Sequence, residues 1–377
     1  MPSILIGADV CPIEANRPYF QAGDAQSLFH DLLPEMAQAD LVVANLECPL
    51  IERPSPILKT GPTFGEPTDC IKGIQAAGID VLCLANNHIM DHGEAGLRTT
   101  LAACERAGIA TVGAGANLAA ARRVWIRQLG RVRVGLLAVA EYEFSIAGEA
   151  TWGANPLDLM DCVRQIQASR AVCDFLIVLL HGAAEFQSPT PRIQKTCRFL
   201  IEQGARAVVV QHPHVLGGYE DYEGGHIIYG QGAWVMDEAI YRERQSFHEG
   251  FLIKLQIAGD TSSTCELIPF VQSAPAPGAR RMQPENEARF RQALAGRSTA
   301  IREATFVEAE WRRFCAERRK GYLHAVLGHH RVLRKLDVGG WLTRLLHSRR
   351  ALLGTRNCVL CETHREALET IFTRLME

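Results

Sequence analysis

The 377-residue chain lacks three features that would assign it to a membrane, secreted or nucleic-acid-binding class. No stretch approaches the roughly 18 consecutive apolar residues of a membrane-spanning helix. The first residues, MPSILIGADV, contain neither the basic region nor the apolar run of a signal peptide. The formal net charge of -2 gives no general attraction to polyanions, so we expect no nucleic acid partner. These absences favour a cytoplasmic protein.

The chain also lacks the cysteine spacing of a disulfide framework, although it contains twelve cysteines. They are scattered singly, and several lie in apolar runs such as DVLCLANN, where a reduced thiol behaves as a small apolar side chain. A chain of this length does not depend on disulfides for stability. We therefore expect reduced cysteines.

Short apolar runs alternate with amphipathic helical segments up to about residue 240, and this alternation predicts an α/β sheet with helices on both faces. The last predicted strand and the run GFLIKLQIAGD have a hairpin-like spacing, which predicts antiparallel pairing. The predicted strands are SILIGAD, DLVVANLE, DVLCLANN, VRVGLLAVA, DFLIVLLHG, AVVVQHP and HIIYGQGAW.

A stretch rich in proline, alanine and glycine, QSAPAPGARRMQPEN, predicts a linker over residues 272–286. It would separate an α/β domain at 1–271 from a helical, basic extension at 287–377. The length alone allows either two domains or one large domain with an appendage.

The predicted extension is basic and amphipathic over residues 311–350, where eleven Lys or Arg residues stand against two acids. A basic amphipathic helix can lie on an anionic membrane surface or bind an anionic polymer. The same pattern also fits helices that pack on the main domain and leave their cations in solvent. The sequence leaves these alternatives open.

Metal-type side chains gather where the predicted strands stop, and in open α/β sheets the ligand crevice lies at the carboxyl ends of the strands. Each residue alone has an ordinary explanation as a helix cap, a core histidine or a turn residue. Their joint occurrence at five strand ends predicts a metal site, because carboxylate, amide and imidazole groups are ligands of Mn, Fe and Zn. The residues are Asp9, Asn45, Glu47, Asn86, Asn87, His88, Asp91, His181, Glu185, His212 and His214.

Several segments resemble the bacterial capsule synthesis protein family of the CapA, or poly-γ-glutamate capsule, type. This family is similar to the calcineurin-like metallophosphoesterases, so the resemblance implies a four-layer α/β/β/α sandwich. It covers residues 3 to about 255. The segments are GAD, ANLECPL, KTGPTFGEP, AAGIDVLCLANNHIMDHGEAGL, AGIATVGAGANLAAAR, LLHGAAEFQSPTP and QHPHVLGG.

The resemblance also implies roles for individual residues. His88 would protonate a leaving group, and Asp91 would orient it. One or two divalent ions, of the Mn, Fe or Zn type, would be bound by Asp9, Glu47, Asn87, His181, His212 and His214.

The chain departs from the family patterns at four places, including HGAAE where the family tends to have His-Trp-Gly and Gln211 where it has the first of two histidines. Cys11 stands where metallophosphoesterases have a histidine ligand, and Ala233 stands where the capsule family has an asparagine near the last strand. These departures leave two functions open.

The first function is a metal-dependent hydrolase or transferase with phosphoester-type chemistry in capsule or surface-polymer biosynthesis. Its substrate would be an anionic phosphate-containing molecule or polymer, contacted by Asn45, Lys59, Glu185 and Arg192. The second is a non-catalytic binding or assembly protein of a polymer synthesis or export complex. In either case residues 311–350 could contact a synthase complex or the inner face of the membrane. The retained His88 and Asp91 favour catalysis, because a purely structural metal site needs no acid.

Overall fold

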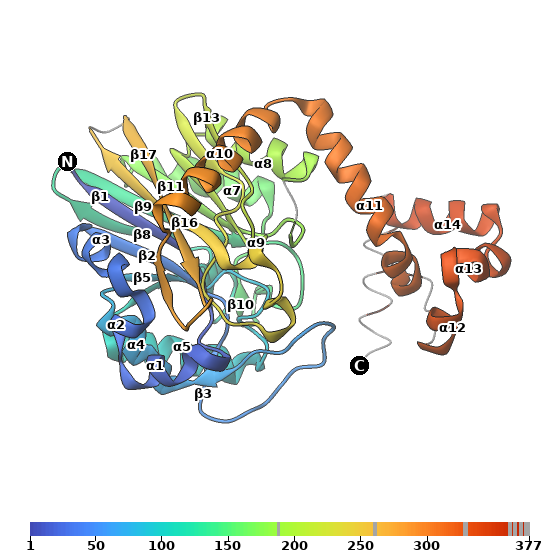
Figure 1. The fold of residues 1–377 in the computed structure, drawn as a ribbon, viewed down its shortest axis with the longest axis horizontal. Helices are drawn as coiled ribbons and strands as arrows, with labels where there is room; N and C mark the ends of the chain where they lie inside the picture. The colour runs from blue at the N-terminus through green and yellow to red at the C-terminus, as the bar shows by residue number, and fades with distance from the viewer. Residues whose placement is uncertain are drawn as a thin grey trace. The chain divides into compact units, whose positions relative to one another are not determined.

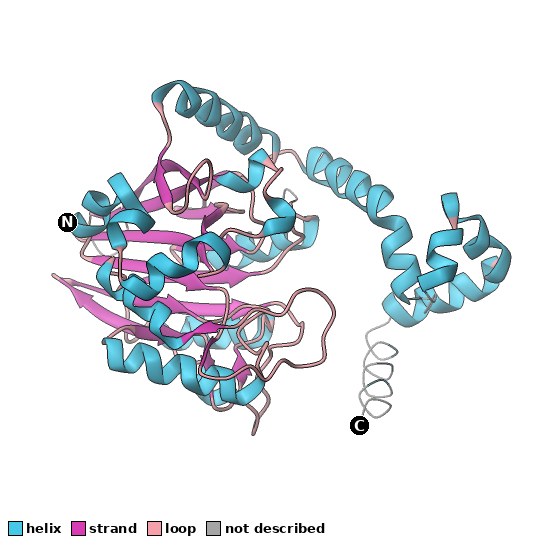
Figure 2. Cartoon of the chain, turned by 60° about the horizontal axis from the view of Figure 1, so that its bottom comes forward, coloured by secondary structure: helices cyan, strands magenta, loops and turns pink. Residues whose placement is uncertain are grey.

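The computed structural model describes residues 1–186, 189–258, 262–326 and 331–360, together with residues 364, 368 and 372. The chain forms two compact units, Met1–Trp311 and Arg312–Glu377. The first unit contains two large β-sheets with helices packed against them, as Figures 1 and 2 show.

The first sheet has the strand order β18-β17-β16-β1-β2-β5-β6, and β15 pairs with the end of β1. Strands β15, β1, β2, β5 and β6 run parallel, whereas β16, β17 and β18 add antiparallel neighbours. The strands are β1 (Ser3–Val10), β2 (Leu41–Leu46), β5 (Val81–Cys83), β6 (Ala110–Val112), β15 (Ala233–Val235), β16 (Glu249–Ile257), β17 (Ser263–Gln272) and β18 (Ala279–Arg281).

The second sheet has the order β13-β14-β12-β11-β9-β8. Its four central strands run parallel, and antiparallel strands border them on both edges. The strands are β8 (Trp125–Leu129), β9 (Val132–Ala140), β11 (Phe175–His181), β12 (Ala207–Gln211), β13 (Tyr219–Tyr222) and β14 (Gly225–Ile228). Two short pairs complete the strands: β3 (Leu50–Ile51) with β4 (Glu66–Pro67), and β7 (Ala114–Gly115) with β10 (Gly153–Ala154).

The two sheets pack face to face over a shared core. In β11, Ile177 and Leu179 belong to the cluster that includes Ile4 of β1, whereas Val178 and Leu180 belong to a separate cluster with α7 and α8. This division follows from the two-residue period of a strand. Because β11 is buried on both faces, its sequence is a continuous apolar run.

Helices cover the outer faces of both sheets and complete the predicted four-layer α/β/β/α sandwich, which the structure confirms (Figure 1). Helices α1 to α5 pack with the first sheet, and α7 and α8 pack with the second. The helices of this unit are α1 (Arg17–Ala22), α2 (Ala25–Phe29), α3 (Leu33–Gln38), α4 (Ile71–Ala76), α5 (Gly93–Ala107), α6 (Leu118–Ala121), α7 (Leu159–Ser169), α8 (Pro191–Glu202), α9 (Gln245–His248) and α10 (Pro284–Ala300).

The expectation of one sheet with helices on both faces is wrong, because strand–helix alternation does not reveal which strands pair. The run HIIYGQGAW divides into β14 and β15, which belong to different sheets. Gly230 and Gly232 lie between them with φ values of 149° and 87°, a backbone conformation that glycine adopts readily. β14 pairs in parallel with β12 and antiparallel with β13, whereas β15 pairs in parallel with β1. The antiparallel prediction is therefore confirmed for β16 and for the pairing of β14 with β13, but not for β15.

The structure divides the chain later than the sequence predicts. Residues 272–286 include β18, which pairs with β17, and the first residues of α10. Phe290 and Leu294 of α10 are buried in the core of the first unit. The proline- and glycine-rich stretch therefore forms the turn between two paired strands, and the first compact unit continues to Trp311.

The second unit is helical, as predicted for the C-terminal extension. Asp337 caps its α13 by accepting hydrogen bonds from Leu342 N at 2.7 Å and Thr343 Oγ1 at 2.6 Å. Among the described residues, no helix is both long and apolar enough to cross a bilayer. Residues 327–330 of the predicted basic stretch lie outside the described residues. The remaining helices are α11 (Ala304–Val326), α12 (Arg331–Leu336), α13 (Trp341–Leu346) and α14 (Arg349–Leu360).

Candidate metal centre

The carboxyl ends of parallel strands from both sheets meet at one place. Asp9 of β1 lies beside Asn45 of β2, and His181 is the last residue of β11. Asn45 Nδ2 lies 2.7 Å from Asp9 Oδ1 and 3.3 Å from His181 Nδ1, so this amide connects the two sheets. All three side chains are buried. The strand ends therefore place oxygen and nitrogen atoms within reach of one another, as the sequence predicts.

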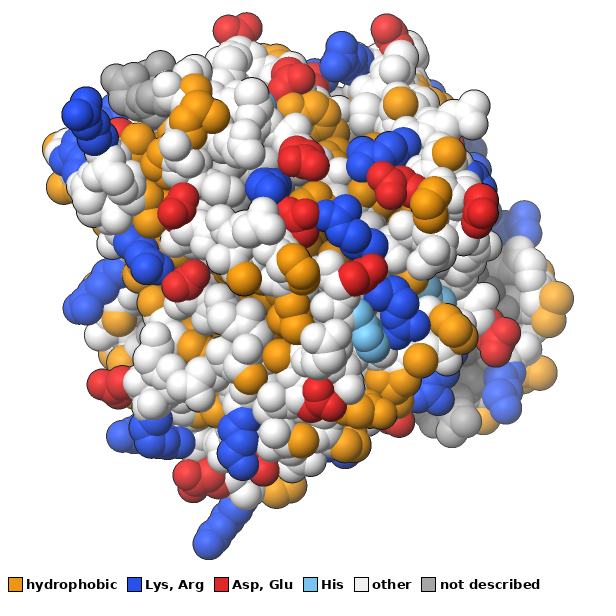
Figure 3. All heavy atoms as spheres, turned by 60° about the vertical axis from the view of Figure 1, so that its left-hand side comes forward, with side chains coloured by type: hydrophobic (Ala, Val, Ile, Leu, Met, Phe, Trp, Pro, Cys, Tyr) orange, Lys and Arg blue, Asp and Glu red, His pale blue; other side chains and the backbone are white. Residues whose placement is uncertain are grey.

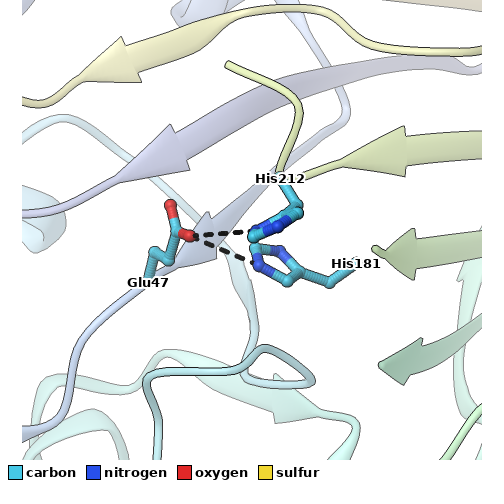
Figure 4. Close-up of side chains that lie close together, drawn as sticks. All are labelled: Glu47, His181 and His212. Carbon is cyan, nitrogen blue, oxygen red and sulfur yellow. Dashed lines mark ion pairs between the residues drawn. The ribbon is translucent and has the colours of Figure 1, made fainter. Parts of the chain in front are cut away.

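Glu47 occupies the middle of this cluster. Its Oε1 lies 3.3 Å from His181 Nε2, 3.9 Å from His212 Nδ1 and 3.7 Å from His214 Nε2. Figure 4 shows Glu47 facing the imidazoles of His181 and His212 from the opposite side of the site. One carboxylate thus approaches three histidines that come from two strand ends of the second sheet.

Asp9 approaches the same histidines from the other side. Its Oδ2 accepts a hydrogen bond from His212 N at 3.1 Å and lies 3.3 Å from His214 Nδ1. His212 and His214 have φ values of 95° and 53°, a conformation that non-glycine residues rarely adopt. Backbone strain of this kind is found preferentially at functional sites. The Asp9 contacts help to hold the strained His-Pro-His turn against the strand ends.

The donor set fits a divalent cation. Two groups share Glu47, one with His181 and His212 and the other with Asp9 and His214, and within each group the ligand atoms lie within 4.8 Å of one another. Glu47 Oε2, His212 Nδ1 and His214 Nδ1 are buried without a hydrogen-bond partner. Buried polar atoms are usually paired, so these three atoms suit coordination of a cation. Imidazole with carboxylate is the donor set of Mn, Fe and Zn.

The electrostatics of the cluster point the same way. Burial alone would raise the pKa of Glu47, but His214 and His181 outweigh it and hold this pKa well below its usual range. Burial would lower the pKa of His214, yet Glu47 and Asp9 raise it to about 10, and Glu47 raises the pKa of His212 in the same way. The carboxylates therefore stabilise positive charge at this place, which a divalent cation would supply in exchange for protons.

A second group of polar residues adjoins the cluster in the turn that follows β5. His88 Nδ1 lies 2.7 Å from Asp91 Oδ2, and the other oxygen of Asp91 accepts a hydrogen bond from Lys59 Nζ at 2.6 Å. The contact with Asp91 favours the tautomer with a proton on Nδ1, which leaves Nε2 of His88 for proton exchange. In the same turn, Asn87 Oδ1 lies 3.0 Å from His181 Nε2. The turn thus joins the His88 pair to the cluster.

Asn86 positions this turn, a role that the sequence prediction missed. Its Nδ2 donates to Asn45 Oδ1 at 3.1 Å and to Leu46 O at 2.8 Å, and its Oδ1 accepts from His88 N at 3.1 Å. The side chain therefore links β2 to the residue that carries the predicted acid. The doublet NN in the sequence was the available signal, but turn chemistry alone also accounts for it.

All four predicted substrate contacts have protein partners in the structure. Glu185 Oε2 accepts a hydrogen bond from Tyr241 OH at 3.0 Å. Arg192 is exposed and forms an ion pair with Glu141. Asn45 and Lys59 bind Asp9 and Asp91, as described above. Whether any of these residues contacts substrate stays a prediction.

Two carboxylates near the cluster were not predicted from the sequence. Glu143 accepts a hydrogen bond from Asn87 Nδ2 at 3.3 Å. Glu238 is buried, and burial raises its pKa to about 7. Both residues lie in loops beyond the strand ends, and no sequence pattern distinguishes them from ordinary surface acids.

Cys11 and Ala233, which depart from the family patterns, are both fully buried. Burial and the neighbouring Cys48 raise the pKa of Cys11 well above its usual value, so its thiol is protonated. Its Sγ lies 3.9 Å from the carbonyl oxygen of Glu47. Ala233 lies beside Asp9 in the pairing of β15 with β1 and adds no donor atom there.

The architecture and the site define a four-layer α/β/β/α protein with a buried carboxylate–histidine centre. The chain belongs to the family described as bacterial capsule synthesis protein PGA_cap, whose pattern matches residues 4–238. This confirms the resemblance found in the sequence.

Three curated relatives illustrate the family. The chain is 26% identical over 252 residues to the capsule biosynthesis protein CapA of Bacillus anthracis, which covers 64% of this chain and 60% of that protein. It is 26% identical over 260 residues to the PGA biosynthesis protein CapA of Bacillus subtilis, with 67% of each chain covered. A polyglutamine synthesis accessory protein of Mycobacterium tuberculosis is 32% identical over 204 residues, covering 50% of this chain and 52% of that protein. The match thus spans about three fifths of the first relative.

Among solved structures, a phosphatase from Mycoplasma pneumoniae is similar over 73% of this chain and 95% of its own length. The sequence identity is 15% and the TM-score is 0.46.

Proposed function

We propose that this chain is a metal-dependent hydrolase or transferase with phosphoester-type chemistry, acting in the synthesis of a capsule or another surface polymer. The observation that carries the proposal is the pair of ligand groups sharing Glu47, with the His88–Asp91–Lys59 group in the adjoining turn. A structural metal site would need only the first of these. Family membership supports the biological setting, and an anionic phosphate-containing or polymer substrate is part of the proposal.

One or two cations of the Mn, Fe or Zn type would be held by Asp9, Glu47, Asn87, His181, His212 and His214, where they would polarise a phosphoryl oxygen and lower the pKa of a water molecule. The residues of the chain supply the remaining steps. With protons on both ring nitrogens, His88 would donate the Nε2 proton to the leaving oxygen and become the neutral Nδ1–H tautomer that Asp91 holds, while Lys59 balances the charge of Asp91. The side chains of Lys59 and Asp91 are 3% and 0% exposed, so solvent screens their ion pair little.

The competing proposal is a non-catalytic binding or assembly protein that keeps the metal. The absence of a donor at Ala233 and the protonated thiol of Cys11 favour it. The two proposals differ in what they require of His88, because an assembly protein needs the cluster but has no use for a proton donor.

The experiment that separates them measures turnover of phosphate monoesters and diesters by the manganese-loaded chain, with His88→Ala and the control His30→Ala. If the chain is a hydrolase, His88→Ala lowers turnover by about 100-fold or more, as expected for loss of a general acid, while the metal content is unchanged. Absence of metal-dependent turnover on any ester would favour the assembly protein.

We also propose that residues 311–350 contact an anionic membrane surface. Large apolar side chains are exposed in this part of the chain, including Val338 (72%), Leu345 (73%) and Trp341 (52%). The surrounding sequence is strongly basic, which suits anionic lipid headgroups. The test is sedimentation with anionic or neutral vesicles. Trp341→Ser should reduce binding to anionic vesicles, and equal sedimentation with neutral vesicles would argue against the proposal.

A further inference from the structure

Arg244 is an exposed arginine in the loop between β15 and β16, next to the metal cluster. We propose that its guanidinium forms a second anion-binding subsite, which takes a carboxylate or phosphate group of the substrate other than the group at the metal. The substrate would therefore carry at least two separated anionic groups. This inference rests on the proposed function.

Two aromatic rings hold the guanidinium of Arg244. Its Cζ lies 4.6 Å from the ring centroid of Phe186 and 5.8 Å from that of Tyr241. The two rings contact each other edge to face, with centroids 4.5 Å apart. A guanidinium that lies over aromatic rings is restricted by these contacts and does not use its N–H donors for them. A guanidinium restricted in this way loses less conformational entropy when it binds an anion.

Within the described part of the chain, the charge of Arg244 is not balanced by a carboxylate. Among the described residues, no carboxylate forms an ion pair with its guanidinium, and Glu185 accepts its hydrogen bond from Tyr241 instead. Arg242 in the same loop is different, because both of its forked nitrogens bind Asp237 at 2.8 Å. The loop thus contains one arginine that anchors it and one whose donors remain available.

The aromatic support of Arg244 is attached directly to the metal cluster. Phe186 N donates a hydrogen bond to Pro213 O at 2.8 Å, between the two histidines of the His-Pro-His turn. The ring centroids of Phe186 and His214 lie 6.3 Å apart. The ring centroid of Phe247 lies 6.0 Å from that of His214 and 5.3 Å from that of Tyr241. Phe186, Tyr241 and Phe247 therefore form an aromatic wall that connects Arg244 to His214. On the face drawn in Figure 3, histidine side chains reach the surface beside Lys and Arg side chains.

These relationships determine the class of ligand. A phosphoryl group at the metal cluster and an oxyanion at Arg244 would be bound by two groups of donors joined by one aromatic wall. An Arg guanidinium binds carboxylates and phosphates in the same bidentate geometry. A chain of carboxylates and a chain of phosphates both satisfy this geometry, and binding measurements distinguish them.

The test is calorimetric titration of the manganese-loaded full chain with three probes: inorganic phosphate, tripolyphosphate and a γ-linked glutamate oligomer. The variants are Arg244→Ala and Arg244→Lys. Arg98→Ala is the matched control, because Arg98 is an exposed arginine stacked on Trp152 with its Cζ 5.4 Å from the ring centroid, on α5. Arg98 differs in that Glu94 neutralises its charge.

We expect Arg244→Ala to raise the Kd for tripolyphosphate or for the glutamate oligomer by about 10-fold to 100-fold, which is the usual effect of losing a charged hydrogen bond. The Kd for inorganic phosphate should remain unchanged, and Arg244→Lys should recover only part of the loss. Whichever of tripolyphosphate and the glutamate oligomer shows the effect identifies the anion.

Equal weakening of all probes, or no weakening of any, would overturn the subsite, as would a wild-type chain that binds neither multiply charged probe. The proposed function is judged separately by turnover. A chain that binds the probes through Arg244 but hydrolyses no ester would retain this subsite and lose the enzymatic assignment.

Discussion

Glu47 Oε1 lies 3.3 Å from His181 Nε2, although Glu47 follows a strand of one sheet and His181 ends a strand of the other. The contact exists because the two sheets pack face to face with their strand ends at the same edge. Glu47 also belongs to both candidate ligand groups. The centre therefore depends on the packing of the two sheets as much as on the identity of its residues.

The first prediction concerns metal content. The chain purified without chelator should contain about one to two equivalents of a transition metal, because its buried donors fit such an ion. The double variant His212→Ala/His214→Ala should lose most of it while remaining folded. Elemental analysis with circular dichroism measures both properties. A metal-free wild type, even after incubation with Mn, Fe or Zn, would rule out the metal centre.

The second prediction concerns the ion pair between Lys59 and Asp91, whose side chains are 3% and 0% exposed. Lys59→Met removes the partner of a buried carboxylate, so the free energy of unfolding should fall by roughly 3 kcal/mol. Lys72→Met is the control, since Lys72 lies 4.0 Å from Asp69 at the surface. It should change stability by less than about 0.5 kcal/mol. Urea denaturation measures both, and equal stability of the two variants would contradict the prediction.

The third prediction concerns pH. Hydrogen bonds from the Arg133 side chain and backbone N–H hold the pKa of Asp174 at about 2. A carboxyl group with a lowered folded-state pKa stabilises the fold above its unfolded value of about 3.9 and loses this effect as the pH falls towards 2. Wild-type chain should therefore have a higher Tm than Asp174→Asn at pH 6, and the difference should disappear near pH 2. A constant difference across this range would show that ionisation of Asp174 is not its source.

The fourth prediction compares two glycines. A Cβ on Gly7 of β1 would lie 2.1 Å from Cε3 of Trp234, so Gly7→Ala should destabilise the fold by about 1–3 kcal/mol through overpacking. A Cβ on Gly296 of α10 meets no atom within 4 Å, and alanine has the higher helix propensity. Gly296→Ala should therefore raise stability by up to about 1 kcal/mol. Thermal unfolding of both variants is the measurement, and a stabilising Gly7→Ala would show that β1 and β15 do not approach as closely as described.

The positions of the central strands, such as β1, β2 and β11, could be predicted from the sequence because each is a short apolar run bordered by turn residues. Short or edge strands such as β13 and β18 lack such a run and were not predicted. Residues such as Asp9, Asn45 and His181 were recognised because metal-type side chains at strand ends are conspicuous against apolar runs. The placement of HIIYGQGAW could not be predicted, because its two halves pair with strands that are distant in the chain. The positioning role of Asn86 and the contact of Glu143 were missed because both consist of hydrogen bonds to residues that only the folded chain brings near.

The sequence by itself determined the kinds of donor atoms, their order along the strands and the family, since local patterning and residue identity carry that information. Only the tertiary structure decided that Glu47 lies between histidines of the opposite sheet, that Cys11 turns towards a backbone carbonyl, and that Arg244 lies over two aromatic rings. These relationships depend on the packing of sheets and loops, whose geometry arises from contacts between residues far apart in the chain.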